Sequence, residues 1–209
     1  MAKKRYLLYA ELGLLYLFAP IIYALGWVQG PKFIALLVGL IYVILVILAN
    51  KKLPHTVFEL RFHGYLQTII TRFLVVALGL TFYMLHFEPE NFLILPRTQT
   101  WLWLAIMIFY PIFSALPQEI IYRLFFIQRY KTLFTNEKLL WVMNALLFGL
   151  AHLLFHNPIA VLGGVLMGIF WYQTYVRTGS LWAVTLEHAL YGNFIYTIGF
   201  GHYFYVPDF

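Results

Sequence analysis

The chain has 209 residues, of which 63% are hydrophobic and only 11% are charged, and its mean hydropathy is +0.80. Soluble globular domains carry roughly 45–50% apolar and about 25% charged residues. This composition excludes a soluble enzyme, a disordered chain and a fibrous repeat. Because cysteine is absent, disulfides, iron–sulfur clusters, thiolate catalysis and cysteine-bound zinc are excluded as well. The net charge of +6 fits basic residues gathered on the cytoplasmic side of a membrane, and we expect no nucleic-acid partner.

Long apolar runs indicate membrane-spanning helices, because a helix needs about 20 apolar residues to cross a bilayer core of about 30 Å. We expect seven spans, to which the family resemblance described below would add one short or re-entrant helix. In chain order they are 6–27, 33–50, 66–85, 101–116, 139–155, 158–176 and 181–199. The helical pattern continues past Pro117, which favours one long kinked helix over 101–130. The expected fold is therefore an all-α, polytopic transmembrane helical bundle, with residues 1–209 as a single integral membrane domain.

The distribution of charge predicts the orientation of the chain, because lysine and arginine collect in cytoplasmic loops. With a cytoplasmic N-terminus, the basic residues on the inner side are Lys3, Lys4, Arg5, Lys51, Lys52, Arg129, Lys131, Lys138 and Arg177. The outer side then holds Lys32, Glu88, Glu90, Arg97 and Asp208. We expect the C-terminus outside, an interfacial helix over 52–67 and an external loop over 87–100.

Ionisable side chains within apolar spans are costly to bury, and they are therefore candidates for function. They are Glu11, Arg72, Glu119, Arg123, His152, Glu187 and His188. Glu11 and Arg72 stand alone without a motif, so we expect a buried pair or a snorkelling side chain at each. Glu119 and Arg123 are four residues apart, and on a helix they share one face and pair.

Three polar groups on successive helices are predicted to lie at similar depths. Glu119 and His152 each lie about 24 Å from the turn near 134–137, at 1.5 Å per residue. His188 lies about 13 Å beyond the turn at 178–180 by the same rise. Antiparallel packing would bring Glu119 and His152 to one level. His188 would reach it as well if the earlier turn projects further into the cytoplasm.

This set of side chains suits the activation of water. A carboxylate and a histidine together remove a proton from water, while a second histidine and an asparagine donate to the oxyanion that forms on a carbonyl. The sequence therefore favours a water-based hydrolase. A metal-bound alternative stays open, because His152 and His156 are four residues apart and Glu119 could join them. A capping or interfacial role fits His156 better, since it stands at a helix end.

These motifs resemble the CAAX protease and bacteriocin-processing family, also called the ABI family of intramembrane endopeptidases. Its Glu-Glu-x-x-x-Arg motif is similar to Gln-Glu-Ile-Ile-Tyr-Arg at 118–123, and its Phe-x-x-x-His motif matches 148–152. Its third motif follows a turn like Thr-Gly-Ser-Leu-Trp at 178–182, and corresponds to 188–193. The resemblance covers roughly 113–193, within a family core of approximately 101–199.

The resemblance implies a role for each matching residue. It implies that Glu119 and His152 hold the nucleophilic water and that Arg123 orients the carboxylate. It also implies that His188 and Asn193 stabilise the oxyanion. The family has an all-helical membrane fold with a cavity open toward the cytoplasm, and its members cleave peptide bonds near the membrane; some remove the last three residues of prenylated proteins.

Two positions depart from the family pattern. Gln118 replaces the first glutamate, which is the general base in the best-studied members, so Glu119 takes that part here, with or without Glu187, or the chain is catalytically inactive. The asparagine of the third motif usually follows its histidine by four residues. That position is Gly192 here, and Asn193 is the fifth, which rotates the amide by about 100° around a helix.

The sequence leaves three functions open. The first is an intramembrane endopeptidase that acts on membrane-associated peptides or proteins in the plasma (inner) membrane. The second is an inactive relative that acts as a membrane adaptor or bacteriocin-immunity factor. The third is a small transporter or channel, although no paired inverted halves are visible. We expect no cofactor and no metal, because a zinc site needs three or four close protein ligands.

Overall fold

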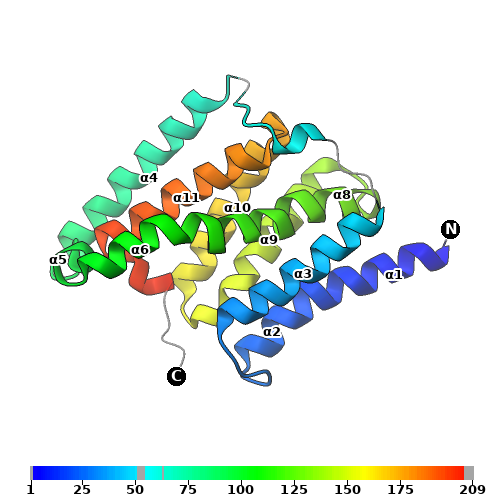
Figure 1. Ribbon diagram of the computed structural model, residues 1–209, viewed down its shortest axis with the longest axis horizontal. Helices are drawn as coiled ribbons and strands as arrows, with labels where there is room; N and C mark the ends of the chain where they lie inside the picture. Colours follow the sequence, from blue (N-terminus) through cyan, green and yellow to red (C-terminus); the bar gives the residue numbers. More distant parts are fainter. Residues whose placement is uncertain (1, 51–54, 63, 205–209) are drawn as a thin grey trace. The chain divides into compact units, whose positions relative to one another are not determined.

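The computed structural model describes residues 2–50, 55–62 and 64–204, and every regular element within these ranges is a helix (Figure 1). Six helical stretches are long and apolar enough to cross a membrane. They are Arg5–Ala24, Lys32–Asn50, Leu66–Phe87, Thr100–Leu133, Glu137–Phe155 and Pro158–Thr178. The predicted all-α, multi-pass membrane fold is therefore confirmed. The predicted long helix is also present, as the 34-residue stretch Thr100–Leu133.

The seventh predicted span forms helix α11 (Leu181–Ile198), but it is not among the six most apolar stretches. Its sequence carries Glu187, His188 and Asn193, and these polar residues lower its hydropathy. Glu187 and His188 are buried inside the protein. Helix α11 is therefore built to pack against protein, because ionisable side chains in a membrane face the protein interior rather than lipid.

The described chain forms two compact units, of which the first holds residues 2–50 and 118–173. Its elements are α1 (Ala2–Gly13), η1 (Leu14–Phe18), α2 (Ala19–Ala24), α3 (Lys32–Asn50), η4 (Ile120–Phe125), α8 (Phe126–Tyr130), η5 (Lys131–Leu133), α9 (Glu137–Ala151), η6 (His152–Phe155), the end of α7 (Leu116–Glu119) and most of α10 (Pro158–Thr178). Helix α2 packs against α9 and η6 in this unit.

Small residues bring α9 and α10 into close contact. A Cβ atom at Gly168 would lie 2.9 Å from the Ala145 Cα atom, and one at Gly149 would lie 2.9 Å from the Val161 carbonyl oxygen. Close approach of this kind is typical of small residues spaced four apart on membrane helices. Ala145 and Gly149 have this spacing on α9, and Gly164 and Gly168 have it on α10.

An ion pair joins α1 to α8 in the same unit. The Arg129 Nη2 atom lies 2.7 Å from the Glu11 Oε2 atom, and the Tyr42 hydroxyl of α3 donates to Glu11 at 2.9 Å. Of the two roles expected for Glu11, a buried pair or a snorkelling side chain, the structure shows an ion pair whose two side chains are half-buried. Charge pairing of this kind lowers the cost of placing a carboxylate at membrane depth.

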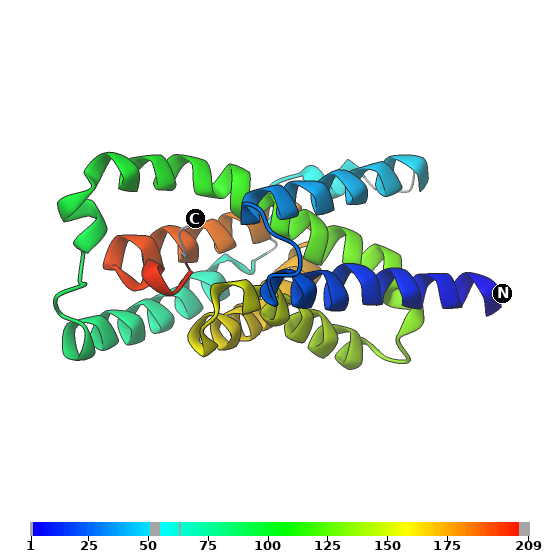
Figure 2. The ribbon, with the colours of Figure 1, turned by 90° about the horizontal axis from the view of Figure 1, so that it is seen from below.

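The second unit holds residues 55–62, 64–117 and 174–204. Its elements are η2 (His55–Phe58), α4 (Leu66–Phe87), α5 (Ile94–Thr98), α6 (Thr100–Tyr110), η3 (Pro111–Ala115), α11 and η7 (Phe200–Phe204). Helices α4 and α11 lie side by side, as both views show (Figure 1, Figure 2). Helix α11 also contacts α5 and α6, so it forms the centre of this unit.

The predicted interfacial helix over 52–67 is wrong for the described residues. Only one 3₁₀ turn forms there, at His55–Phe58, before Leu66 begins α4. Gly64 has φ +75°, a left-handed conformation that interrupts a right-handed helix. Lys51, Lys52, His63 and Asp208, on which part of the predicted topology depends, lie outside the described residues.

Candidate active-site residues

Glu119 and Arg123 form the predicted pair inside the first unit. The Arg123 Nε atom lies 3.3 Å from the Glu119 Oε2 atom, and both side chains are fully buried. Glu119 ends α7, and Arg123 lies in the π-helical segment η4. Gln118 precedes Glu119 on the same helix and is half-buried. A carboxylate is thus held beside a guanidinium in the protein interior.

Two side chains satisfy backbone carbonyls of the π-helical segment η4. The Tyr16 hydroxyl donates to the Ile121 carbonyl oxygen at 2.7 Å, and the Asn144 amide donates to the Tyr122 carbonyl oxygen at 2.6 Å. Every backbone group at membrane depth needs a partner inside the protein. These bonds therefore stabilise a widened helical turn in the segment that carries Arg123, and π-turns are often found at functional sites.

His152 lies where α9 gives way to the 3₁₀ segment η6. Its Nδ1 atom lies 2.8 Å from the Phe148 carbonyl oxygen. Because a carbonyl only accepts, Nδ1 carries the hydrogen, and in the neutral ring Nε2 carries the lone pair. A Cβ atom at Gly164 would lie 2.8 Å from His152 Nδ1, so the glycine provides the space for the ring.

Phe148, the first residue of the second motif, packs between the arginine and the histidine. The Arg123 guanidinium lies 4.6 Å from the centre of the Phe148 ring, in a cation–π contact. The His152 ring lies 4.9 Å from the same ring, centre to centre. The first unit thus joins Glu119, Arg123, Phe148 and His152 through adjoining contacts.

His188 and Asn193 lie on α11 in the second unit. His188 is 2% exposed, and its Nε2 atom lies 3.0 Å from the Tyr110 hydroxyl. The Asn193 Nδ2 atom donates to the Met107 carbonyl oxygen of α6 at 3.2 Å. This bond uses one of the two amide hydrogens of Asn193 and fixes its side chain toward α6. Glu187 is equally buried, at 2% exposure.

The structure corrects the geometry behind the metal-bound alternative. His152 and His156 do not share an α-helical turn, because α9 ends at Ala151 and His156 has a left-handed φ of 55°. The next residue, Asn157, accepts from the Ala160 amide at 2.8 Å and caps α10. Among the described residues, no three His, Asp or Glu side chains are grouped so that they could hold a metal. The expectation of a metal-free site stays a prediction.

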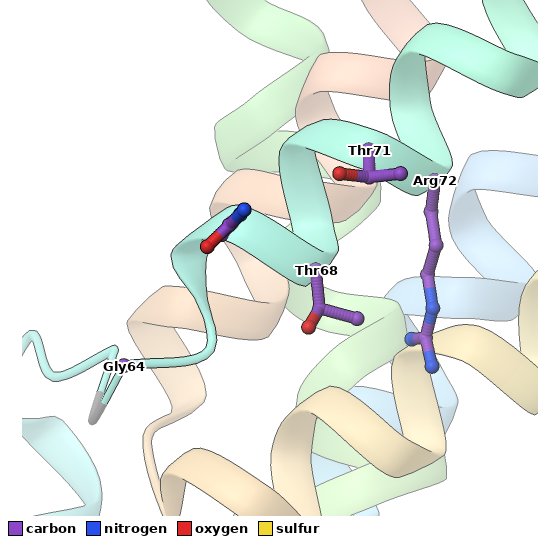
Figure 3. Close-up of a pocket in the computed structure, with 5 residues that line it drawn as sticks. Gly64, Thr68, Thr71 and Arg72 are labelled. Carbon is purple, nitrogen blue, oxygen red and sulfur yellow. The ribbon is translucent and has the colours of Figure 1, made fainter.

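A polar hollow lies at the start of α4. Among the predicted site candidates, Arg72 lines it. Its volume is ≈ 300 Å³, and it is lined by Gly64, Gln67, Thr68, Thr71 and Arg72. Thr68 and Arg72 extend from the helix in the same direction (Figure 3). The Arg72 guanidinium lies 5.4 Å from the centre of the Tyr65 ring, back toward the helix start, as a snorkelling side chain does.

Tyr110 was not singled out in the sequence, and Gly192 was noted only as the position where the asparagine of the third motif is missing. Tyr110 is separated from His188 by 78 positions, so no local spacing joins them. The available signal was a tyrosine directly before Pro111, inside a long apolar run rather than at its end. Interfacial positions are where membrane tyrosines are usual.

The fold and these side chains define a class, a multi-pass membrane protein with acid–base groups buried in its helices. Residues 98–194 match the family described as type II CAAX prenyl endopeptidase Rce1-like, so this stretch is similar to a family of CAAX-type intramembrane proteases. The predicted resemblance is confirmed. No curated protein and no solved structure matches the chain.

Proposed function

We propose that the protein is an intramembrane endopeptidase that cleaves membrane-associated peptides or proteins with a water activated by Glu119 and His152. The observation that carries the proposal is the fixed tautomer of His152, whose Nδ1–H donates to the Phe148 carbonyl. Nε2 of the neutral ring is then a base, which is the state that general-base catalysis needs. The buried carboxylate of Glu119, which is paired with Arg123, supplies a second proton acceptor.

The proposed reaction assigns one role to each residue that matches a family motif. Glu119 and His152 take a proton as water attacks the scissile carbonyl. His188 and the second amide hydrogen of Asn193 donate to the oxyanion of the tetrahedral intermediate. The proton then passes to the leaving nitrogen, the C–N bond breaks, and a carboxylate and an amine result. Arg123 keeps the Glu119 carboxylate in place.

The proposed setting is the plasma (inner) membrane, with the N-terminus in the cytoplasm and residues 1–209 as one domain. The proposal includes no metal, no cofactor and no nucleic acid. Its alternative is an inactive relative that binds peptides as an adaptor or immunity factor. Gln118 favours this alternative, because a glutamine at the first motif position cannot accept a proton.

Single substitutions at the two adjacent motif residues, Gln118 and Glu119, test the proposal. Glu119→Gln should lower peptidase activity about 10²–10⁴-fold, since loss of a general base costs that much. Gln118→Glu should keep or raise activity, because it adds a second carboxylate. Purified variants in liposomes would be compared on a library of membrane-proximal peptides.

Two outcomes would count against the enzyme. If Glu119→Gln cleaves as well as the parent, Glu119 is not the base. If only Gln118→Glu cleaves, the natural chain is an inactive relative and the adaptor role replaces the peptidase.

A further inference from the structure

Tyr110 and His188 are joined by a hydrogen bond inside the second unit. Tyr110 is the last residue of α6, and its hydroxyl oxygen lies 3.0 Å from His188 Nε2 on α11. The two rings meet edge to face, with centres 5.9 Å apart and planes at 71°. The Tyr196 ring also packs against the Tyr110 ring, with centres 5.7 Å apart. Aromatic contacts thus hold the Tyr110 ring in place, and its hydroxyl lies within hydrogen-bond distance of His188.

Gly192 provides the space that this arrangement needs. A Cβ atom at residue 192 would lie 2.6 Å from the Tyr110 hydroxyl oxygen and nearer still to its ring. Real Cβ atoms do not approach other atoms so closely, so any side chain at 192 would displace the phenol from His188. Gly192 follows His188 by one helical turn, which places the gap on the same face of α11.

We infer that Tyr110 is a positioning residue that holds His188 in its Nδ1–H tautomer. This inference rests on the proposed function. The phenol is the more acidic donor and a neutral imidazole nitrogen the more basic acceptor, so the O–H donates to Nε2. Nδ1 then carries the hydrogen, and it is a donor for the oxyanion. The state of a histidine nitrogen is set by the bond that the other nitrogen makes.

The two candidate histidines are therefore held in the same Nδ1–H tautomer, but each ring is held through a different nitrogen. His152 donates from Nδ1 to the Phe148 carbonyl, which makes its Nε2 a proton acceptor. His188 accepts at Nε2 from Tyr110, which makes its Nδ1 a donor. Two imidazoles of one sequence thus acquire different roles, one in water activation and one in oxyanion stabilisation, from the partner that each one meets.

The tautomer of His188 is directly measurable by ¹⁵N NMR of the full chain with labelled histidine. His188→Gln identifies the signals of the residue by their loss. The parent should show a protonated Nδ1 and an unprotonated, hydrogen-bonded Nε2. In Tyr110→Phe, which keeps the ring and removes only the hydroxyl, these signals should change to a mixture of tautomers. A protonated Nε2 in the parent would overturn the inference.

Kinetics give a second readout. Tyr110→Phe should lower kcat about 2–10-fold, the usual effect of one hydrogen bond. KM should stay unchanged, because oxyanion stabilisation acts in the transition state. Tyr196→Phe removes a phenol oxygen of the same aromatic cluster whose hydroxyl donates to the Phe204 carbonyl oxygen at 3.4 Å, and it should leave both kcat and the His188 signals as in the parent. An equal effect of both tyrosine variants would contradict a specific role for Tyr110.

The readouts separate this inference from the proposed function. A parent without peptidase activity that shows the Nδ1–H tautomer would reject the enzyme and keep the Tyr110–His188 assignment. An active parent in which Tyr110→Phe changes neither kcat nor the His188 signals would keep the enzyme and reject the assignment.

Discussion

Burial of the Glu119–Arg123 ion pair costs free energy, because both charged side chains are removed from water. Both side chains are fully buried, so bulk water does not solvate either charge. Moving such charges from water costs several kcal/mol for each ion, and their attraction offsets this only in good geometry. A pair of well-packed apolar residues would usually be as stable. The pair is therefore better explained by chemistry at Glu119 than by stability.

This explanation predicts an asymmetry between single and double variants. Arg123→Met should destabilise the fold by about 3–5 kcal/mol, because it leaves the Glu119 charge buried without its cation. Glu119→Leu/Arg123→Met should recover most of that loss while it abolishes peptidase activity. Unfolding in detergent, followed for the parent and both variants, measures the difference. A double variant less stable than Arg123→Met would show instead that the pair stabilises the fold.

The sequence predicts local residue relationships well and distant ones poorly. The contact between Glu119 and Arg123 follows from their spacing of four residues. The hydrogen bond between Tyr110 and His188 depends on how α6 packs on α11, which no spacing encodes. In the sequence, Gly192 was notable only because it stands where the family has an asparagine. In the structure it is also the residue that makes room for the Tyr110 ring.

Prolines shape the long helices at the scale of elements. The π-helical segment η1 ends two residues before Pro20, and η3 ends two residues before Pro117. Proline lacks the amide hydrogen that the preceding turn would use, and its ring disturbs that turn. A disturbed helical turn before Pro117 was predictable for this reason. The widening over η4 was not, because no proline lies within Ile120–Phe125 and side chains from other helices stabilise it.

The Glu88 carboxylate, in the loop after α4, binds side chains of the segment η7. Glu88 accepts hydrogen bonds from Tyr83 at 3.2 Å, from Asn91 at 3.2 Å and from Tyr203. The His202 Nε2 atom lies 3.4 Å from the same carboxylate. Burial raises the pKa of Glu88. The hydrogen bonds from Tyr203 and Asn91 and the charge of His202 lower this pKa by more, so it lies below its usual value.

The lowered pKa of Glu88 predicts how the stability that its carboxylate contributes depends on pH. A carboxyl with a depressed folded-state pKa adds stability above its unfolded pKa of about 4.3, and this stability is lost as pH falls through the folded value. At neutral pH, Glu88→Gln should therefore unfold at a lower temperature than the parent. The difference should shrink below about pH 4. Thermal unfolding in detergent from neutral to acidic pH measures it.

Glu90→Gln is the matched control for this experiment. Glu90 is exposed in the same loop, so its substitution should give a difference from the parent that is small at every pH. A Glu88→Gln difference that stays constant as pH falls would mean that the carboxyl charge does not hold η7.

The membrane fold was predictable at the scale of the whole molecule, because apolar runs of bilayer length have few other uses. Six of the seven predicted spans meet that criterion. Helix α11 does not, since the residues proposed for chemistry lower its hydropathy. The interfacial helix over 52–67 failed because a mixture of polar and apolar residues does not exclude a turn, and Gly64 makes one.

The orientation of the chain is the whole-molecule prediction that the charges support. With an inner N-terminus, successive spans place Arg129, Lys131 and Lys138 together on the cytoplasmic side, while Arg97 lies outside. Basic residues within about 15–20 residues of span ends set orientation in this way. The proposed peptidase would then receive its substrates from the cytoplasmic face. Because the chain has no cysteine, single introduced cysteines report each side without background.

Thr135→Cys and Gln99→Cys test this orientation without changing any charge, and both positions are exposed. A maleimide that cannot cross membranes should label Gln99→Cys in intact cells. It should label Thr135→Cys only after the membrane is permeabilised, since that residue lies in the turn before α9 on the basic side. The cysteine-free parent should stay unlabelled in both conditions. Labelling of Thr135→Cys but not Gln99→Cys in intact cells would reverse the topology, and substrates would then have to arrive from outside.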